Sequence, residues 1–315
     1  MVDVAGGGAI GFALETTHGS YIAPTNWATV TSESLREVRS DPWRKPIIGQ
    51  AVTLGKVEGK EHVEGSLTME LLAETFVYFL IASRWGNNIA QGGSGPYTYT
   101  AKDDAAVHVK TNYRSLTIIA DRAGIGFAYL GCQATSFRFF LEDGIPMVEV
   151  GIIGRHQSED YTPGSPTIPT ETPFAANDAV LQVSGSTRSD IDSLEISFDD
   201  NGEAVHNITS SAGADYVKFG EHEGEANFEI DFESKADYAI WVARTSQALT
   251  YVATKAANQK VDIDMHGPLY DTFEVNLSGI GDQVKASATL KSAYIHADTA
   301  STTIIVTTAA NITLA

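Results

Sequence analysis

The chain has 315 residues, a formal net charge of −19 and a single cysteine. This length suits two domains of about 150 residues, each large enough to bury its own core. The acidic balance argues against a protein that wraps nucleic acid, because that kind of binding depends on cations that meet phosphates. The lone Cys132 excludes an intrachain disulfide, and we expect it to be a small buried thiol.

The N-terminal stretch from Met1 to Ser20 is rich in glycine and lacks the basic region of a signal peptide. Gly6, Gly8 and Gly11 have the spacing of a dinucleotide-binding fingerprint. That fingerprint needs a following helix, whereas Thr16 to Ser20 is typical of a turn. We therefore expect a flexible arm that packs against a neighbouring subunit.

The segment from Ser40 to Gly59 contains two prolines, which disfavour a central strand. We expect a long excursion from the domain body that carries Trp43, Arg44 and Lys45 outward. An ordinary surface loop is the alternative. Exposed Trp and Arg are enriched at interface hot spots, which favours an inter-subunit or inter-ring contact.

The hydrophobic period changes within the stretch from Glu61 to Trp85. Apolar and polar residues alternate from Gly65 to Leu71, as in a half-buried strand. From Phe76 to Trp85 the apolar residues follow a helical period and nearly encircle the helix. Such a helix must be covered on most sides, and Phe76 and Phe79 are candidates for a contact with a neighbour. The longest apolar run here is too short to cross a bilayer.

Further strands are predicted where short apolar runs lie between turn residues. They span Tyr97 to Thr100, Val107 to Lys110, Ser115 to Ala120, Phe137 to Leu141 with Met147 to Ile153 as a hairpin, Thr272 to Leu277 with Val284 to Leu290, and Thr302 to Thr307.

The strand-to-helix switch recurs 159 residues later, which indicates a tandem duplication. The second copy runs into a helix from Lys235 to Arg244, whose Tyr238 and Trp241 are further contact candidates. The identities at this offset place Glu223, Gly224, Glu229 and Glu233 on Glu64, Gly65, Glu70 and Glu74, Ile240 on Ile81, and Ser193 and Leu194 on Ser34 and Leu35.

We accordingly predict a mainly β protein with two tandem, duplicated β-rich domains, each with one α-helix. The domains span residues 1–158 and 175–315, joined by a linker at 159–174 that contains four of the ten prolines. The halves differ in charge. Up to Ser158 there are 13 basic and 16 acidic residues, a net of −3, and after it 8 and 24, a net of −16.

No catalytic, cofactor-binding or metal site is predicted. The histidines are scattered, and none forms a zinc or nucleophile motif with its required context. His62 and His222 follow Glu61 and Glu221 in the repeat, and we interpret them as polar residues facing water rather than as acid/base pairs. The acids Asp199, Asp200 and Glu221 to Glu233 are interpreted as solvated strand faces rather than as calcium ligands.

The order of four motifs resembles the tail tube proteins of long non-contractile-tailed bacteriophages. The motifs are GxxxETTHGS from Gly11, TVTSESL from Thr29, PIIGQ from Pro46 and GKVEGxxxxEGSLxxEL from Gly55, followed by the apolar helix. The resemblance covers roughly the first 85 residues in motif order and the rest by architecture. It implies a structural virion protein of the tail, not an enzyme, made in the host cytoplasm.

The resemblance further implies that each domain is a tail-tube-like β-sandwich or barrel-like sheet pair with one flanking α-helix. Such domains assemble as stacked rings around a channel for double-stranded DNA, which passes without specific binding. The partners would be other copies of this chain and other tail proteins at the tube ends. No membrane contact is expected. Two tube-like halves allow a trimeric, pseudo-sixfold ring, with a hexameric ring as the alternative. Lumen-lining acids are expected to include Glu70, Glu225, Glu229 and Asp231. A secreted carbohydrate-binding or adhesive β-sandwich is the alternative function.

Overall fold

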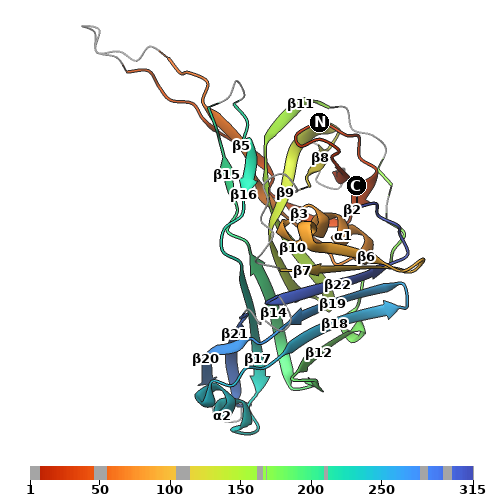
Figure 1. Cartoon of the computed structure of the whole chain (residues 1–315), viewed down its shortest axis with the longest axis vertical. Coiled ribbons are helices and arrows are strands. Elements are labelled where there is room, and N and C mark those ends of the chain that lie inside the picture. The colour runs from red at the N-terminus through yellow and green to blue at the C-terminus, as the bar shows by residue number, and fades with distance from the viewer. Residues whose placement is uncertain are drawn as a thin grey trace.

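The computed structural model describes residues 8–45, 55–103, 114–161, 166–167, 169–208, 212–276, 283–293 and 300–314. Within these ranges the chain is mainly β, with antiparallel strands in two main sheets and two short α-helices (Figure 1). The prediction of a mainly β protein with two helices is confirmed.

The larger sheet contains an uninterrupted antiparallel series of strands, which we call the continuous sheet. Its order is β4 (Arg36–Ser40), β5 (Lys60–Glu70), β10 (Ile145–Gly154), β9 (Ile125–Glu142), β14 (Ile191–Asp199), β17 (Glu223–Asp231), β21 (Lys285–Lys291) and β20 (Leu269–Asn276). β3 (Val30–Glu33) pairs with β5 on the same edge as β4. The pairing of β9 with β14, where Phe139 faces Ile196, joins the two predicted domains into one sheet.

β9 is long because it serves two groups of strands. Its first part pairs with β8 (Leu116–Arg122) and β11 (His156–Tyr161), and its second part pairs with β10 and β14. β1 (Ala9–Leu14) and β2 (Asn26–Ala28) extend the first group beyond β8. Gly131 lies between the two parts with φ of 66°, and a Cβ there would come within 2.9 Å of the His18 ring. Glycine is therefore required at the change of direction.

The second sheet combines strands from both predicted domains. Its order is β13 (Ser186–Thr187), β12 (Ala179–Val183), β18 (Leu249–Ala256), β19 (Gln259–Met265), β22 (Thr302–Thr308), β7 (Tyr97–Lys102) and β6 (Ile89–Gly92). The pairing of β22 with β7 places Ile304 opposite Ala101. The short hairpin of β15 (Glu203–Val205) and β16 (Tyr216–Lys218) lies beside the projecting ends of β4 and β5 (Figure 1).

α1 (Ala73–Ile81) is buried between the sheets, and seven of its nine residues lie in the core. Phe76 meets the rings of Phe137 and Phe139 edge-on, with centroids 5.5 and 5.4 Å apart. Its first turn is capped from the linker, because the Glu171 carboxylate accepts a hydrogen bond from the Glu74 amide at 3.0 Å. The helix ends earlier than predicted, at Ile81, and a 3-10 helix, η2 (Arg84–Asn88), follows.

α2 (Ala236–Ala243) lies against β20 at the far end of the molecule (Figure 1). It ends at Arg244, which adopts the left-handed conformation with φ of 53°. A second 3-10 helix, η3 (Ala176–Asp178), leads from the linker into β12.

The N-terminal arm was predicted wrongly from Ala9 onward. These residues form β1, an inner strand between β2 and β8, and Phe12 is fully buried with its ring 5.3 Å from that of Phe79. The reason is that Ile10 and Phe12 alternate with small residues and so present one apolar face to the core. Residues 1–7 lie outside the described ranges, as do the predicted strand from Val107 to Lys110 and residues 46–54 of the predicted excursion.

The other predicted strands are confirmed within a few residues. They correspond to β5, β7, β8, the β9–β10 hairpin, β20 with β21, and β22.

Candidate functional site

One face of the continuous sheet is apolar and packs on the core, and the opposite face is polar. On β17, Ala226, Phe228 and Ile230 are buried, whereas the residues between them are half-buried or exposed. An antiparallel sheet with this alternation keeps one face in water. We call the polar side the polar face, and it is a candidate site built by several strands.

Arg138 marks the middle of the polar face, on β9. The strand register sets it opposite Glu149 and Ser197. Its guanidinium donates to Glu149 at 3.3 Å and to Glu195 at 2.5 Å, so it bridges β10 and β14 across the joint between the two predicted domains. These hydrogen bonds raise the pKa of Arg138, with Glu195 as the main cause.

The register places the four predicted lumen acids on this same face. Glu70 lies two residues beyond Thr68, which is opposite Glu149. Glu225 and Glu229 flank Asn227, which is opposite Glu195, and Asp231 is the next residue outward in the alternation. The structure therefore brings together acids from two strands that are more than 150 residues apart in sequence. Whether the face lines a channel remains a proposal.

Two lysines of β21 on the polar face already have carboxylate partners. Lys291 forms an ion pair with Asp271 at 3.3 Å, and Lys285 is bound to Asp192. The hydrogen bond to Asp192 raises the pKa of Lys285, with Glu229 and Asp231 contributing. Within the described ranges, no Lys or Arg forms an ion pair with the predicted acids Glu70, Glu225 or Glu229. The face consequently presents net negative charge.

The centre of the polar face is hollowed over β9, β14, β17, β20 and β21. The hollow has a volume of about 680 Å³ and is lined mainly by hydroxyl, amide and carboxylate side chains, with the Phe140 ring at one side. Such a broad polar hollow lacks the enclosed, mostly apolar walls of a small-molecule site. Chemically, it can repel anions and offer hydroxyls to water.

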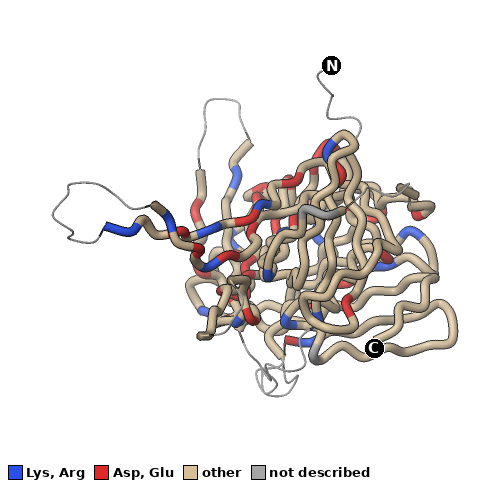
Figure 2. Tube along the Cα trace, turned by 90° about the horizontal axis from the view of Figure 1, so that it is seen from above, with Lys and Arg blue, Asp and Glu red and all other residues tan. Residues whose placement is uncertain are grey.

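The three predicted contact residues of the excursion are all exposed. Trp43 is 55% exposed and pairs across the base of the projection with Lys56, whose Nζ lies 5.5 Å from the ring centroid. Arg44 and Lys45 are also exposed. Figure 2 shows Lys and Arg along this projecting part of the chain, which stands away from the body. A contact role for these residues remains a proposal.

The helix candidates differ in accessibility. Phe76 and Phe79 are fully buried within the chain, so they have no surface to offer a neighbour. Tyr238 on α2 is 40% exposed, and Trp241 is half-buried with its ring stacked 6.4 Å from Phe273. Of the four helix candidates, Tyr238 and Trp241 are the two with surface that a neighbour could contact.

A buried charge cluster, which the sequence patterns did not reveal, joins the two predicted domains. Arg84 lies 3.1 Å from Asp103 and 3.9 Å from Asp200, and it donates to the Gly220 carbonyl at 2.9 Å. His222 Nδ1 lies 2.7 Å from Asp200 Oδ1. All four side chains are at most 8% exposed.

The interpretation of His222 as a residue facing water is therefore wrong. Its ring stacks on Phe198 with centroids 5.8 Å apart and is closed off by Trp85 at 5.2 Å. A polar group in such an apolar setting needs a partner, and Asp200 supplies it. His62 is more accessible and lies 3.7 Å from Glu64 rather than pairing with Glu61.

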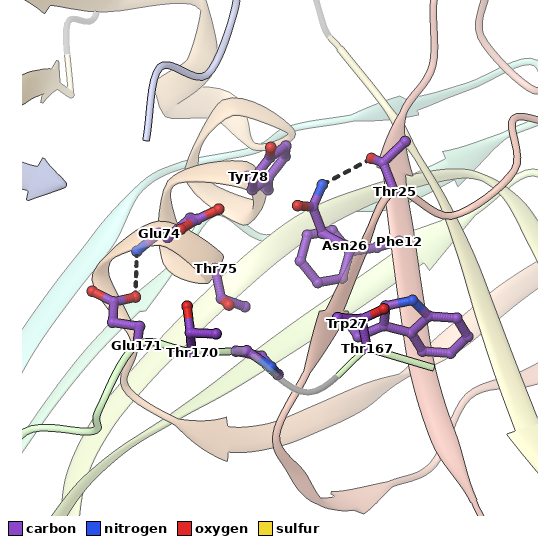
Figure 3. Close-up of a pocket in the computed structure, with 11 residues that line it drawn as sticks. Phe12, Thr25, Asn26, Trp27, Glu74, Thr75, Tyr78, Thr167, Thr170 and Glu171 are labelled. Atoms are coloured by element: carbon purple, nitrogen blue, oxygen red, sulfur yellow. Dashed lines mark hydrogen bonds between the residues drawn. The ribbon is translucent and has the colours of Figure 1, made fainter. Parts of the chain in front are cut away.

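A smaller pocket of about 190 Å³ lies beside the N-terminus of α1 (Figure 3). Phe12, Trp27 and Tyr78 contribute aromatic walls, and Glu74 and Glu171 contribute carboxylates. Burial raises the pKa of both Glu74 and Glu171. Because Glu171 caps α1, the pocket is explained by the docking of the linker on the helix.

Across the described ranges, His, Cys, Asp and Glu side chains form no group of three that could hold a metal ion. None of the helices there has the length and apolar character to span a bilayer. Cys132 is a buried free thiol, as predicted, and burial raises its pKa.

Comparison with known proteins agrees with the resemblance noted in the sequence. A family model described as phage tail tube protein matches residues 7–292. A comparison with curated proteins finds no match. The match covers nearly the whole chain, so it extends the resemblance well beyond the first motifs and leaves the alternative of a secreted binding module without support. The chain belongs to the phage tail tube protein family, as a non-enzymatic structural protein of the virion tail.

Proposed function

We propose that three copies of this chain form a pseudo-sixfold ring, and that stacked rings make the tube through which double-stranded DNA leaves the virion. The observation that carries this proposal is the continuous sheet, which joins two similar groups of strands and, in the described part of the chain, has an unpaired strand edge at each end. Membership of the tail tube family implies that the chain self-assembles into a tube, and the continuous sheet supports a trimeric ring as the unit of that tube.

The strand order supports an internal duplication. β4, β5, β10 and β9 are followed in space by β14, β17, β21 and β20, and each group contains a hairpin at its end. Met69 and Val148 are opposite each other in the first group, as Phe228 and Ala288 are in the second. Met69 and Phe228 are 159 residues apart, the offset found in the sequence.

One pair of sequence identities does not occupy matching positions. Ser34 donates its amide hydrogen to Ser66, whereas Ser193 is opposite Glu229, which matches Glu70 at the offset of 159. The upstream strand has therefore slipped by four residues between the two groups. Strand edges tolerate such slips when the alternation of faces is preserved, and a four-residue slip preserves it.

The joint between β9 and β14 provides a template for ring closure. In the second group, β20 occupies the place that β9 has in the first group. In the first group, β3 and β4 occupy the place that β14 has in the second group. Both lie at the ends of the continuous sheet with their outer edges unpaired in the described part of the chain. Open edges are pairing sites, and a head-to-tail contact that repeats about an axis can close a ring. Three sheets joined β20 to β3 would present six groups of strands around the channel.

The polar face is the side we assign to the channel. Duplex DNA carries about one negative charge per 1.7 Å of its axis, so a cationic channel would hold it. Glu70, Glu225, Glu229 and Asp231 would instead repel the phosphates weakly along the bore. The DNA then passes without specific binding.

Rings would stack through the excursion between Ser40 and Gly59 and its second-half counterpart, Asp199 to Gly220. The described parts of both project on the same side, where the amide of Glu61 donates to the Ala212 carbonyl at 2.9 Å (Figure 1). Other tail proteins would meet the ring at the two ends of the tube.

A double cysteine variant, Val30→Cys with Val275→Cys, tests the ring. If β20 of one copy pairs with β3 of the next copy as β9 pairs with β14 within the chain, Val275 at the end of β20 faces Val30 of the next copy. Residues opposite each other in a sheet have Cβ atoms about 5 Å apart. After oxidation of assembled tubes, we expect covalent species of up to three chains. Species of up to six chains, or six chains counted in a cryo-microscopy cross-section, would establish the hexameric model instead. A matched control is Val30→Cys with Val180→Cys, since Val180 is 39% exposed against 40% for Val275.

A further inference from the structure

α2 is apolar nearly all round, yet no element in the described part of the chain covers its outer side. Seven of its eight residues, ADYAIWVA, carry no charge, and the remaining Asp237 is paired with Arg188 at 3.0 Å. No residue of α2 is fully buried, with Val242 60% exposed and Tyr238 40% exposed. Helices with apolar residues on all sides are normally enclosed by other elements. Among the described residues, the outer side of α2 therefore lacks the cover that an apolar helix normally has.

α2 occupies the same place on its group of strands as α1 does on the first. α1 follows β5 and packs Phe76 on Phe139 of β9. α2 follows β17, the counterpart of β5, and packs Tyr238 and Trp241 on Phe273 of β20, at 6.1 and 6.4 Å. Phe139 and Phe273 correspond through their hairpins, opposite Val148 and Ala288. The two helices thus differ in what lies over them, not in what lies beneath.

Part of the cover of α1 comes from the other half of the chain, and β2 with Phe12 of β1 supplies cover from its own half. α1 contacts β19 and β22 of the second sheet, which follow β14 in sequence. The helix that packs on the first group of strands is thus covered in part by strands of the second sheet, which come from the second half of the chain. The second group is followed in the ring by the first group of the next copy.

That next copy offers a hollow beside its open edge. It has a volume of about 530 Å³, with Ile10, Ala28 and Val30 as its apolar lining and Glu33 and Arg122 among the polar residues. Ile10 is on the core side of β1, and Val30 is opposite the buried Met69, so the hollow lies behind β3 on the side where the core is. α2 lies on the corresponding side of β20, because Phe273 beneath it faces the core.

We propose that α2 is an inter-subunit helix, whose outer side is covered by the hollow behind β3 in a second copy of this chain. This inference rests on the proposed ring, and it adds that side chains behind the sheet, as well as strand edges, hold the copies together. α2 would then pack between two neighbouring copies, as α1 packs between the two halves of one chain.

The test measures the reactivity of a cysteine placed on α2, before and after assembly. In Val242→Cys, a maleimide reagent should modify the unassembled chain readily and the assembled tube at least tenfold more slowly. Val180→Cys, on an exposed valine of β12, should react at similar rates in both states, and wild-type protein reports any background from the buried Cys132. Negative-stain microscopy of the same samples shows independently whether rings are present.

A second variant probes the energetic role of the cover. Val242→Asp should leave the thermal unfolding of the unassembled chain unchanged, because the side chain is exposed there, and should lower the yield of rings at least tenfold. Val180→Asp should lower neither. If rings form while Val242→Cys stays reactive, or if Val242→Asp assembles like wild type, the inference is overturned and the ring stands. Protection of Val242→Cys in the unassembled chain also overturns it, because the cover would then come from the same copy.

Discussion

Replacement of Arg84 by methionine should strongly destabilise the folded chain, because Arg84 is the arginine of the buried charge cluster. Arg84→Met leaves Asp103 and Asp200 buried, with His222 as the remaining nearby base. Removing one partner of a buried ion pair costs about 3 to 5 kcal/mol, because a charge is left without compensation in a poorly solvated site. The variant also leaves the Gly220 carbonyl without the hydrogen bond that Arg84 donates at 2.9 Å.

The measurement is equilibrium urea unfolding of the unassembled chain. With an m value of about 3 kcal/mol/M, the expected loss moves the midpoint down by about 1 to 1.7 M. Arg138→Met is the matched control, since Arg138 also bridges two carboxylates but is 46% exposed. Each exposed pair contributes about 0.2 to 1 kcal/mol, so the loss of both pairs should move this midpoint by no more than about 0.7 M.

The double variant Arg84→Met with Asp103→Asn separates charge from packing. It removes one of the two carboxylates that Arg84 compensates, so it should be more stable than Arg84→Met alone. The reasoning would be refuted if Arg84→Met cost no more than Arg138→Met, or if the second substitution added a full further loss.

Two further predictions concern protons and charge. Burial, with Arg155 and His156 nearby, lowers the pKa of His18 below its ordinary 6.5 despite the opposing effect of Glu15. The unfolded chain therefore binds this proton more readily, so stability should fall as pH drops below about 6.5, and His18→Gln should flatten a urea-midpoint profile measured from pH 7 to 5; an unchanged profile would contradict this. Glu229→Lys should permit tube assembly but slow DNA delivery in an infection assay. The control Asp264→Lys, on the second sheet, should permit assembly and leave the delivery rate unchanged. Equal delivery rates for the two variants would show that Glu229 does not line the channel.

Several elements could be predicted because their signals are local. The alternation from Gly65 to Leu71, followed by a helical period, locates β5 and α1, and the Glu142 to Gly144 turn locates the β9–β10 hairpin. The alternation along β17 also predicted which of its acids share a face. That Glu70 shares this face could not be deduced, because it depends on the order of strands that lie between β5 and β17.

Other features had a signal that was overlooked, or none. β18 and β19 alternate clearly, as in Val261, Asp262, Ile263, Asp264 and Met265, and could have been predicted. The first part of β9 is buried on both faces and so shows no period. The charge cluster draws on four separated segments, and nothing in the sequence near Arg84 or His222 indicates its partners.

The pairing of β7 with β22 has a consequence for synthesis. These strands are about 200 residues apart in sequence, and at translation rates of about 5 to 20 residues per second the first waits roughly 10 to 40 s for the second. Contacts between such distant segments form late in folding, because a long loop must close first. α1 lies against β22 and β19, so its apolar surface is sealed only when those late strands arrive. A nascent chain in which β22 has not yet been made therefore leaves part of the apolar surface of α1 exposed.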